Sequence, residues 1–162
     1  MEQTKVIADI LDNARRLTRW YFSFLNEDLL YSRFELDGTR LNSAYWIAGH
    51  LAWTQDFVLS GILGKKESPS WVDDFKLGHP APDPNEGPDF DALWDVFNYL
   101  HRKTIQFIRD FDEKTLDHDF PDTAAHFIFR TNRMAFYHLV RHEGYHCGQL
   151  GIICKLGGVE TI

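Results

Sequence analysis

The stretch TNRMAFYHLVRHEGYHCGQLGIICKLGG, residues 131–158, decides how this sequence is expected to fold. Thr131 is a residue type that caps helix N-termini, and Gly157-Gly158 is a strong helix stop. Between these signals, apolar residues such as Leu139 and Leu150 recur near the helical period. The stretch therefore predicts one long helix with an apolar face directed into a hydrophobic core.

His142 and His146 lie four residues apart in this helix, so both imidazoles project from one face, one turn apart. Two nitrogens placed in this way can share a metal ion at about 2.0–2.1 Å each. The same face carries Leu139 and Leu150, and polar rings on an apolar face are costly unless something satisfies them. The spacing favours metal ligation, and the alternative is a pair hydrogen-bonded to buried water or backbone. His138, one turn earlier, is an alternative candidate ligand, which the resemblance described below disfavours.

The rest of the chain also reads as helices joined by turns. Cap-type residues, stop signals and apolar periodicity predict further helices over residues 4–30, 43–64 and 89–111. A turn is expected at Asp37-Gly38. No strand is predicted, although the run 126–129 (HFIF) is ambiguous.

A long connection separates the second and third predicted helices. Five of the six prolines lie between Lys65 and Pro88, so this segment cannot be regular helix. The segments on either side are each too short to fold alone, so residues 1–162 are expected to form a single domain. Four long helices predict an all-α, antiparallel four-helix bundle with this Pro-rich connection between helices two and three. Trp71 and Phe75 are candidates for covering a site, but a plain surface connector is the preferred interpretation.

Composition limits the classes of function. Apolar residues make up 44% and charged residues 25%, as in ordinary globular domains. A formal charge of −7 without a basic cluster argues against nucleic acids and anionic membranes as partners. Neither a transmembrane segment nor a secretory signal is recognisable. Cys147 and Cys154 are expected to be too far apart on one helix to form a disulfide, so free thiols predict a cytoplasmic protein.

His50 is the natural third ligand for a metal held by the last helix. It lies in the middle of the second predicted helix among Trp46 and Trp53. Its neighbour Gly49 can allow a neighbouring helix or a ligand to approach closely. Taken alone, His50 reads as a core histidine. The histidines outside this set read as solvated or simply hydrogen-bonded side chains: His79, His101, His118 and His126.

Residues 142–146 (HEGYH) also match H-E-x-x-H, in which two histidines bind zinc and the glutamate activates water. One extended form of that motif needs Gly and His where this chain has Gln149 and Ile152. Few residues follow that could supply another ligand. An HExxH-type metallohydrolase with Glu143 as its base is therefore a minor alternative. Otherwise Glu143 is a solvated surface carboxylate or a group that supports a ligand.

Two blocks of sequence carry a resemblance to a known family. One is Trp-x-x-x-His-Leu-Ala-Trp at residues 46–53, and the other is His-x-x-x-His-x-Gly-Gln at residues 142–149. Their order, a separation of about ninety residues and the helical pattern cover nearly the whole chain. In these features the sequence resembles the DinB-like superfamily of damage-inducible proteins and their relatives.

The resemblance implies a four-helix bundle in which His50, His142 and His146 hold one divalent metal ion, with water in its open positions. Three imidazoles suit zinc or nickel, and also iron or copper. The Gly148-Gln149 pair matches the family pattern, which implies a supporting or packing role for it. Cys147 stands where the family often has a basic residue, and a packing role is expected for it.

The leading hypothesis is a metal-dependent enzyme of the thiol-dependent transferase or isomerase kind, acting on a small-molecule substrate. The resembled family includes bacillithiol transferases and a mycothiol-dependent maleylpyruvate isomerase, which implies an exogenous low-molecular-weight thiol. A metal with an open position lowers the pKa of a bound thiol or water. The alternative is a non-catalytic metal-binding or dimeric interaction protein. The resemblance also implies a homodimer.

Overall fold

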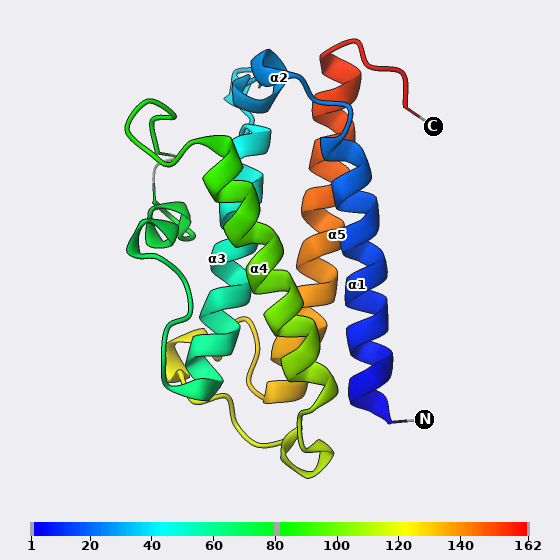
Figure 1. Cartoon of the computed structure of the whole chain (residues 1–162), viewed down its shortest axis with the longest axis vertical. Helices are drawn as coiled ribbons and strands as arrows, with labels where there is room; N and C mark the ends of the chain where they lie inside the picture. The colour runs from blue at the N-terminus through cyan, green and yellow to red at the C-terminus, as the bar shows by residue number, and fades with distance from the viewer. Residues whose placement is uncertain (1, 80–81, 162) are drawn as a thin grey trace.

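The computed structural model of the chain describes residues 2–79 and 82–161. Within these residues, the body is built from four helices of 20 residues or more (Figure 1): α1 (Gln3–Phe22), α3 (Ala44–Leu63), α4 (Phe90–Arg109) and α5 (Asn132–Leu156). The shorter elements are α2 (Glu27–Tyr31), β1 (Glu35–Leu36), β2 (Thr39–Arg40), η1 (Ser70–Phe75), η2 (Glu113–Thr115) and η3 (Thr123–Ala125). The predicted all-α four-helix bundle is confirmed.

Capping chemistry explains where three of the long helices begin and where α3 ends. The Ser43 side chain accepts a hydrogen bond from the Trp46 amide at the start of α3, and Gly64 ends that helix at φ 70°. A positive φ of this size is readily adopted only by glycine. Asp89 and Thr131 cap α4 and α5 through their side chains in the same way as Ser43. These helices follow the predicted ranges closely.

The first predicted helix, residues 4–30, is broken in the structure. α1 ends at Phe22, and α2 starts after Asn26, whose side chain accepts a hydrogen bond from the Leu29 amide. The prediction was wrong here because an internal cap competes with helix continuation. The ambiguous run 126–129 follows η3 as a non-regular segment, and its Phe129 is buried.

The helix directions differ from the antiparallel arrangement predicted from the sequence. Figure 1 shows α3 and α4 starting at the same end of the bundle, because the segment between them returns along its length. Tyr45, at the start of α3, donates a hydrogen bond of 2.8 Å to the Pro88 carbonyl just before α4. α1 and α5 are likewise parallel, since Arg133 donates to Gln3 where both helices begin. The long connection acts as a crossover, which the presence of prolines alone did not reveal.

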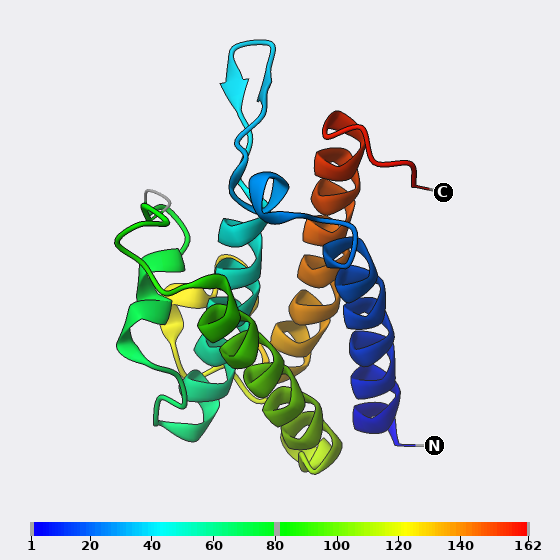
Figure 2. The ribbon, with the colours of Figure 1, turned by 45° about the horizontal axis from the view of Figure 1, so that its top comes forward.

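The packing follows from these directions. α1 packs against α5 and α4, while α3 packs against α4 and α5. The β1–β2 hairpin, with Asp37 and Gly38 at positive φ in its turn, projects beyond the end of the bundle (Figure 2). The predicted turn is confirmed, although the two short strands were not predicted. None of the helices in the described part of the chain has the length and apolar composition of a membrane span.

The connection between α3 and α4 is more than a surface connector. Phe75, at the end of η1, is fully buried. A Cβ atom on Gly49 would lie only 2.1 Å from the Phe75 ring, so the ring occupies space that only glycine leaves open. Asp56 accepts hydrogen bonds from the Glu67 amide and the Ser68 hydroxyl, which ties the start of the connection to α3. The preferred interpretation of a plain connector was wrong, because apolar burial and these hydrogen bonds hold the segment against α3.

Candidate metal centre

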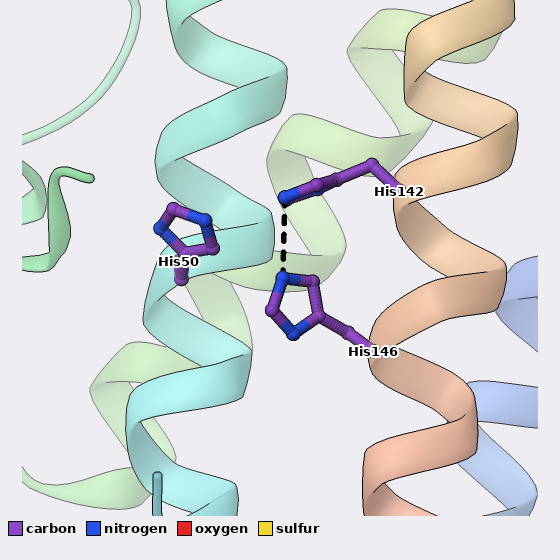
Figure 3. A group of neighbouring side chains, drawn as sticks. All are labelled: His50, His142 and His146. Carbon is purple, nitrogen blue, oxygen red and sulfur yellow. Dashed lines mark hydrogen bonds between the residues drawn. The ribbon is translucent and has the colours of Figure 1, made fainter.

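Three histidines from two helices meet between α3 and α5 (Figure 3). His50 projects from α3, and His142 and His146 project from α5 toward it. One ring nitrogen from each histidine lies within 4.8 Å of the others. The Nε2 atoms of His142 and His146 are 3.1 Å apart. Two imidazoles bound to one tetrahedral ion have nitrogens about 3.3 Å apart, so the pair is close to the spacing of shared ligands.

Hydrogen bonds fix which ring nitrogen of His50 faces the cluster. Its Nδ1 lies 2.8 Å from the Phe75 carbonyl oxygen. Because a carbonyl can only accept, Nδ1 carries the proton and donates it, which leaves the lone pair on Nε2. The buried connection thus orients the His50 ring. Metal-binding histidines are commonly oriented in this way, by donating their second ring N–H to a carbonyl or carboxylate.

His146 is held by a similar contact within α5. Its Nδ1 lies 2.8 Å from Oε1 of Gln149, one turn further along the helix. When Nδ1 donates to this oxygen, the Nε2 lone pair is directed toward His142. The supporting role that the family resemblance implied for Gln149 agrees with this contact.

Aromatic rings enclose the His50 side of the cluster. The imidazole of His50 stacks on Trp46 at a centroid distance of 4.4 Å and on Trp53 at 5.7 Å. His50 and His146 are buried, and His142 is partly exposed. One side of the cluster is therefore apolar, and the His142 side reaches solvent.

Burial and mutual proximity keep these imidazoles neutral. Burial, followed by the neighbouring His146 and His50, lowers the pKa of His142 to about 2. Burial, followed by His50, lowers the pKa of His146 to about 4, and burial also lowers the pKa of His50. Neutral imidazoles have the lone pairs that metal ions require. The three rings therefore keep unprotonated nitrogens that are available to a metal ion.

The remaining histidines lie outside this cluster. The ring of His138 is 5.0 Å from that of His142, but its Nδ1 accepts a hydrogen bond of 2.9 Å from Arg141. His101 on α4 contacts Asp12 of α1 and Gln55 of α3. His126 lies 2.8 Å from the Phe120 carbonyl. The structure thus groups the three histidines singled out from the sequence and leaves the others apart.

Glu143 is placed neither as a catalytic base nor as a solvated carboxylate, two of the roles that the sequence offered for it. Its side chain is 1% exposed, so it is not a solvated carboxylate. Its two oxygens accept hydrogen bonds of 2.8 Å from Nε and Nη2 of Arg15 on α1. A glutamate base of an HExxH enzyme must instead face the water beside the metal. The metallohydrolase alternative with Glu143 as base is therefore corrected, because this carboxylate is buried and paired with Arg15 of α1.

Arg15 was not identified from the sequence, although a signal for it exists. The buried positions of α1 include Ile7, Leu11, Arg15, Thr18 and Phe22, which recur at three- and four-residue steps. An arginine at such a step on a core-facing stripe is unusual, because buried charges require a partner. The periodicity therefore could have predicted a buried ion pair, but not its partner.

Cys147 and Cys154 are free and buried, at 4% and 0% exposure. Burial raises the pKa of both thiols. A raised thiol pKa reduces the thiolate fraction and the reactivity of cysteine. The packing role expected for Cys147 is consistent with this environment.

The fold and the histidine cluster together define a class: a four-helix bundle with a candidate three-histidine centre between its second and last long helices. Residues 10–150 match the sequence profile described as the DinB superfamily, and the chain belongs to this family. No curated protein gave a significant match.

A solved structure shares the architecture. The chain is similar to the crystal structure of a conserved protein from Enterococcus faecalis, with a TM-score of 0.73 and 16% sequence identity. The match covers 96% of this chain and 97% of that one. At this level of identity the similarity supports the fold alone.

Proposed function

We propose that His50, His142 and His146 bind one divalent transition metal ion, and that the protein is a metal-dependent enzyme of the thiol-dependent transferase or isomerase kind. The observation that carries the proposal is the convergence of three neutral imidazoles, one nitrogen of each within 4.8 Å of the others. Three nitrogen ligands suit zinc or nickel, and also iron or copper.

The chain's own residues prepare the site before any ligand arrives. The Phe75 carbonyl and Gln149 hold the Nδ1 atoms of His50 and His146, so that both rings present Nε2. Trp46 and Trp53 exclude water from the faces of His50. Rings fixed in this way lose little conformational freedom when a metal binds, and this raises the affinity of the site for the metal.

Three protein ligands leave a fourth position of a tetrahedral ion open, as in catalytic rather than structural zinc sites. A bound divalent ion supplies Lewis acidity, which lowers the pKa of a low-molecular-weight thiol or of water at neutral pH. The partly exposed His142 gives a small molecule a route to that position. By contrast, a surface hollow of about 740 Å³ between α1 and α4 includes none of the three histidines.

The metal site is tested by elemental analysis of untagged protein. Wild type is expected to contain about one equivalent of a transition metal, and His142→Ala almost none. His138→Ala is the matched control, since its ring lies one turn away on the same helix but outside the cluster. Metal retained in His142→Ala at the wild-type level, or absent from wild type after reconstitution with zinc or nickel, contradicts the proposal.

Catalysis is tested separately. Metal-loaded wild type is expected to accelerate conjugation or isomerisation of an electrophile in the presence of a small thiol, and His142→Ala is not. A metal-loaded protein that stays inactive across such a screen supports the non-catalytic alternative. The homodimer also stays a prediction, which light scattering coupled to size-exclusion chromatography checks.

A further inference from the structure

A pocket beside the histidine cluster combines one cation with apolar walls. It has a volume of about 340 Å³ and is lined by Ile128, Met134, Tyr137, His138 and Arg141. Met134 and Tyr137 are 46% and 49% exposed, which is high for large apolar side chains on a helix. A volume of this size is within the range of small-molecule sites. Its lining therefore suits a small ligand with an apolar body.

The charge in this pocket is free for a ligand. No carboxylate of the described residues lies within 4 Å of the Arg141 guanidinium, whereas Arg133 on the same helix is paired to Asp117 through two hydrogen bonds. Nη2 of Arg141 donates to Nδ1 of His138 at 2.9 Å. Because arginine can only donate, His138 accepts with a neutral ring and holds the guanidinium without cancelling its charge.

The same histidine connects the pocket to the cluster. His138 forms one wall of the pocket, and its ring centroid is 5.0 Å from that of His142. The ring of His138 also packs against Phe129, at a centroid distance of 5.2 Å. One imidazole therefore separates a ligand in the pocket from the nearest residue of the three-histidine cluster.

We infer that this pocket recognises the substrate as an organic carboxylate with an aromatic or aliphatic body. The carboxylate pairs with Arg141, whose planar guanidinium can donate two parallel hydrogen bonds to it. Arg141 carries one positive charge and His138 is neutral, so the pocket has the net charge that balances one carboxylate. The apolar body lies against Ile128, Met134 and Tyr137, which places the reacting group near the cluster. The assignment to substrate rests on the proposed function, but the binding of carboxylates to the pocket does not.

The probes for this inference are benzoate and its neutral analogue benzamide, titrated into zinc-supplied full-length protein and followed by NMR. Benzoate is expected to shift the methyl signals of Ile128 and Met134 and to bind at least about tenfold more tightly than benzamide. Arg141→Gln is expected to remove this preference. Arg130→Gln is the matched control, because Arg130 is exposed and already lies 3.5 Å from Asp119. It is expected to keep the preference.

His142→Ala separates this inference from the proposed function. The variant is expected to lose metal and to keep the preference for benzoate, because Arg141 is unchanged. A preference that disappears in His142→Ala but survives in Arg141→Gln would place the carboxylate at the metal and overturn the inference. Equal binding of benzoate and benzamide by wild type overturns it as well.

Discussion

Arg15 and Glu143 form a buried ion pair between α1 and α5, with two hydrogen bonds of 2.8 Å and side chains that are 0% and 1% exposed. The guanidinium also stacks on the Phe97 ring at 3.7 Å and donates to the Phe97 carbonyl at 3.3 Å. One side chain thus joins α1, α4 and α5. Each charge depends on the other, because a lone charge in the core is strongly unfavourable.

Glu143→Gln is expected to destabilise the fold by about 3–5 kcal/mol, since it leaves the Arg15 charge buried without a partner. Urea unfolding measures the change in free energy of unfolding. The double variant Arg15→Met/Glu143→Leu is expected to recover most of the loss, because apolar replacements of similar volume remove both charges. The metal content of folded Glu143→Gln is expected to equal that of wild type. A near-neutral effect of Glu143→Gln on unfolding would refute the importance of the pair.

Gly49→Ala is expected to destabilise the fold by about 1–3 kcal/mol, because the new methyl group overlaps the buried Phe75 ring. It is also expected to weaken metal binding, since movement of Phe75 removes the acceptor of the His50 Nδ1 proton. Thermal unfolding and metal titration measure the two effects.

Gly144→Ala is the matched control for Gly49→Ala. Gly144 also lies within a long helix, and an added Cβ meets no atom within 4 Å among the described residues. A gain of up to about 1 kcal/mol is expected from its higher helix propensity. If Gly49→Ala is as well tolerated as Gly144→Ala, the connection does not pack as described.

Gln149→Leu is expected to weaken metal binding by about 10–100-fold, because His146 loses the acceptor that orients its ring. Competition with a chromogenic chelator measures the dissociation constant. Gln106→Leu is the control, since Gln106 is exposed and its amide donates to Asp110 at the C-terminal end of α4. Equal affinities of the two variants would show that Gln149 does not support the site.

The stability of the fold is expected to fall as the pH falls from about 6.5 to 4. Burial, followed by the charge of Arg15, lowers the pKa of His101 from 6.5 to about 4. Between these values the unfolded chain binds more protons than the folded one, so acid favours unfolding. Above about pH 6.5 His101 is neutral in both states and costs no stability. As the pH falls to about 4, the loss of stability due to His101 grows to roughly 3 kcal/mol at most.

His101→Gln isolates this contribution from that of the other buried histidines. Urea unfolding of wild type and variant at pH 7 and pH 4.5 is expected to show a loss of stability that is smaller in the variant by about 2 kcal/mol. Identical pH dependence in the two proteins would contradict the assignment to His101.

Much of the helical architecture could be predicted because it depends on neighbours in sequence. Ser43, Asp89 and Thr131 cap their own helices through side chains, so the chain carries these boundaries locally. The break after Phe22 could not be predicted as readily, because helix continuation and the Asn26 cap compete at similar energies.

The sequence by itself determined that His142 and His146 share a face, because the helical period fixes the angle between them. It did not determine what each face of α5 meets. Glu143 is one residue from His142, a rotation of about 100°, and this step separates the histidine cluster from the ion pair with Arg15. Which neighbour covers each face depends on how α1, α3 and α5 pack, and that packing is set by burial across the whole core. The meeting of His50 with the pair and its orientation by Phe75 were likewise decided only by the tertiary structure, because those contacts join segments far apart in the chain.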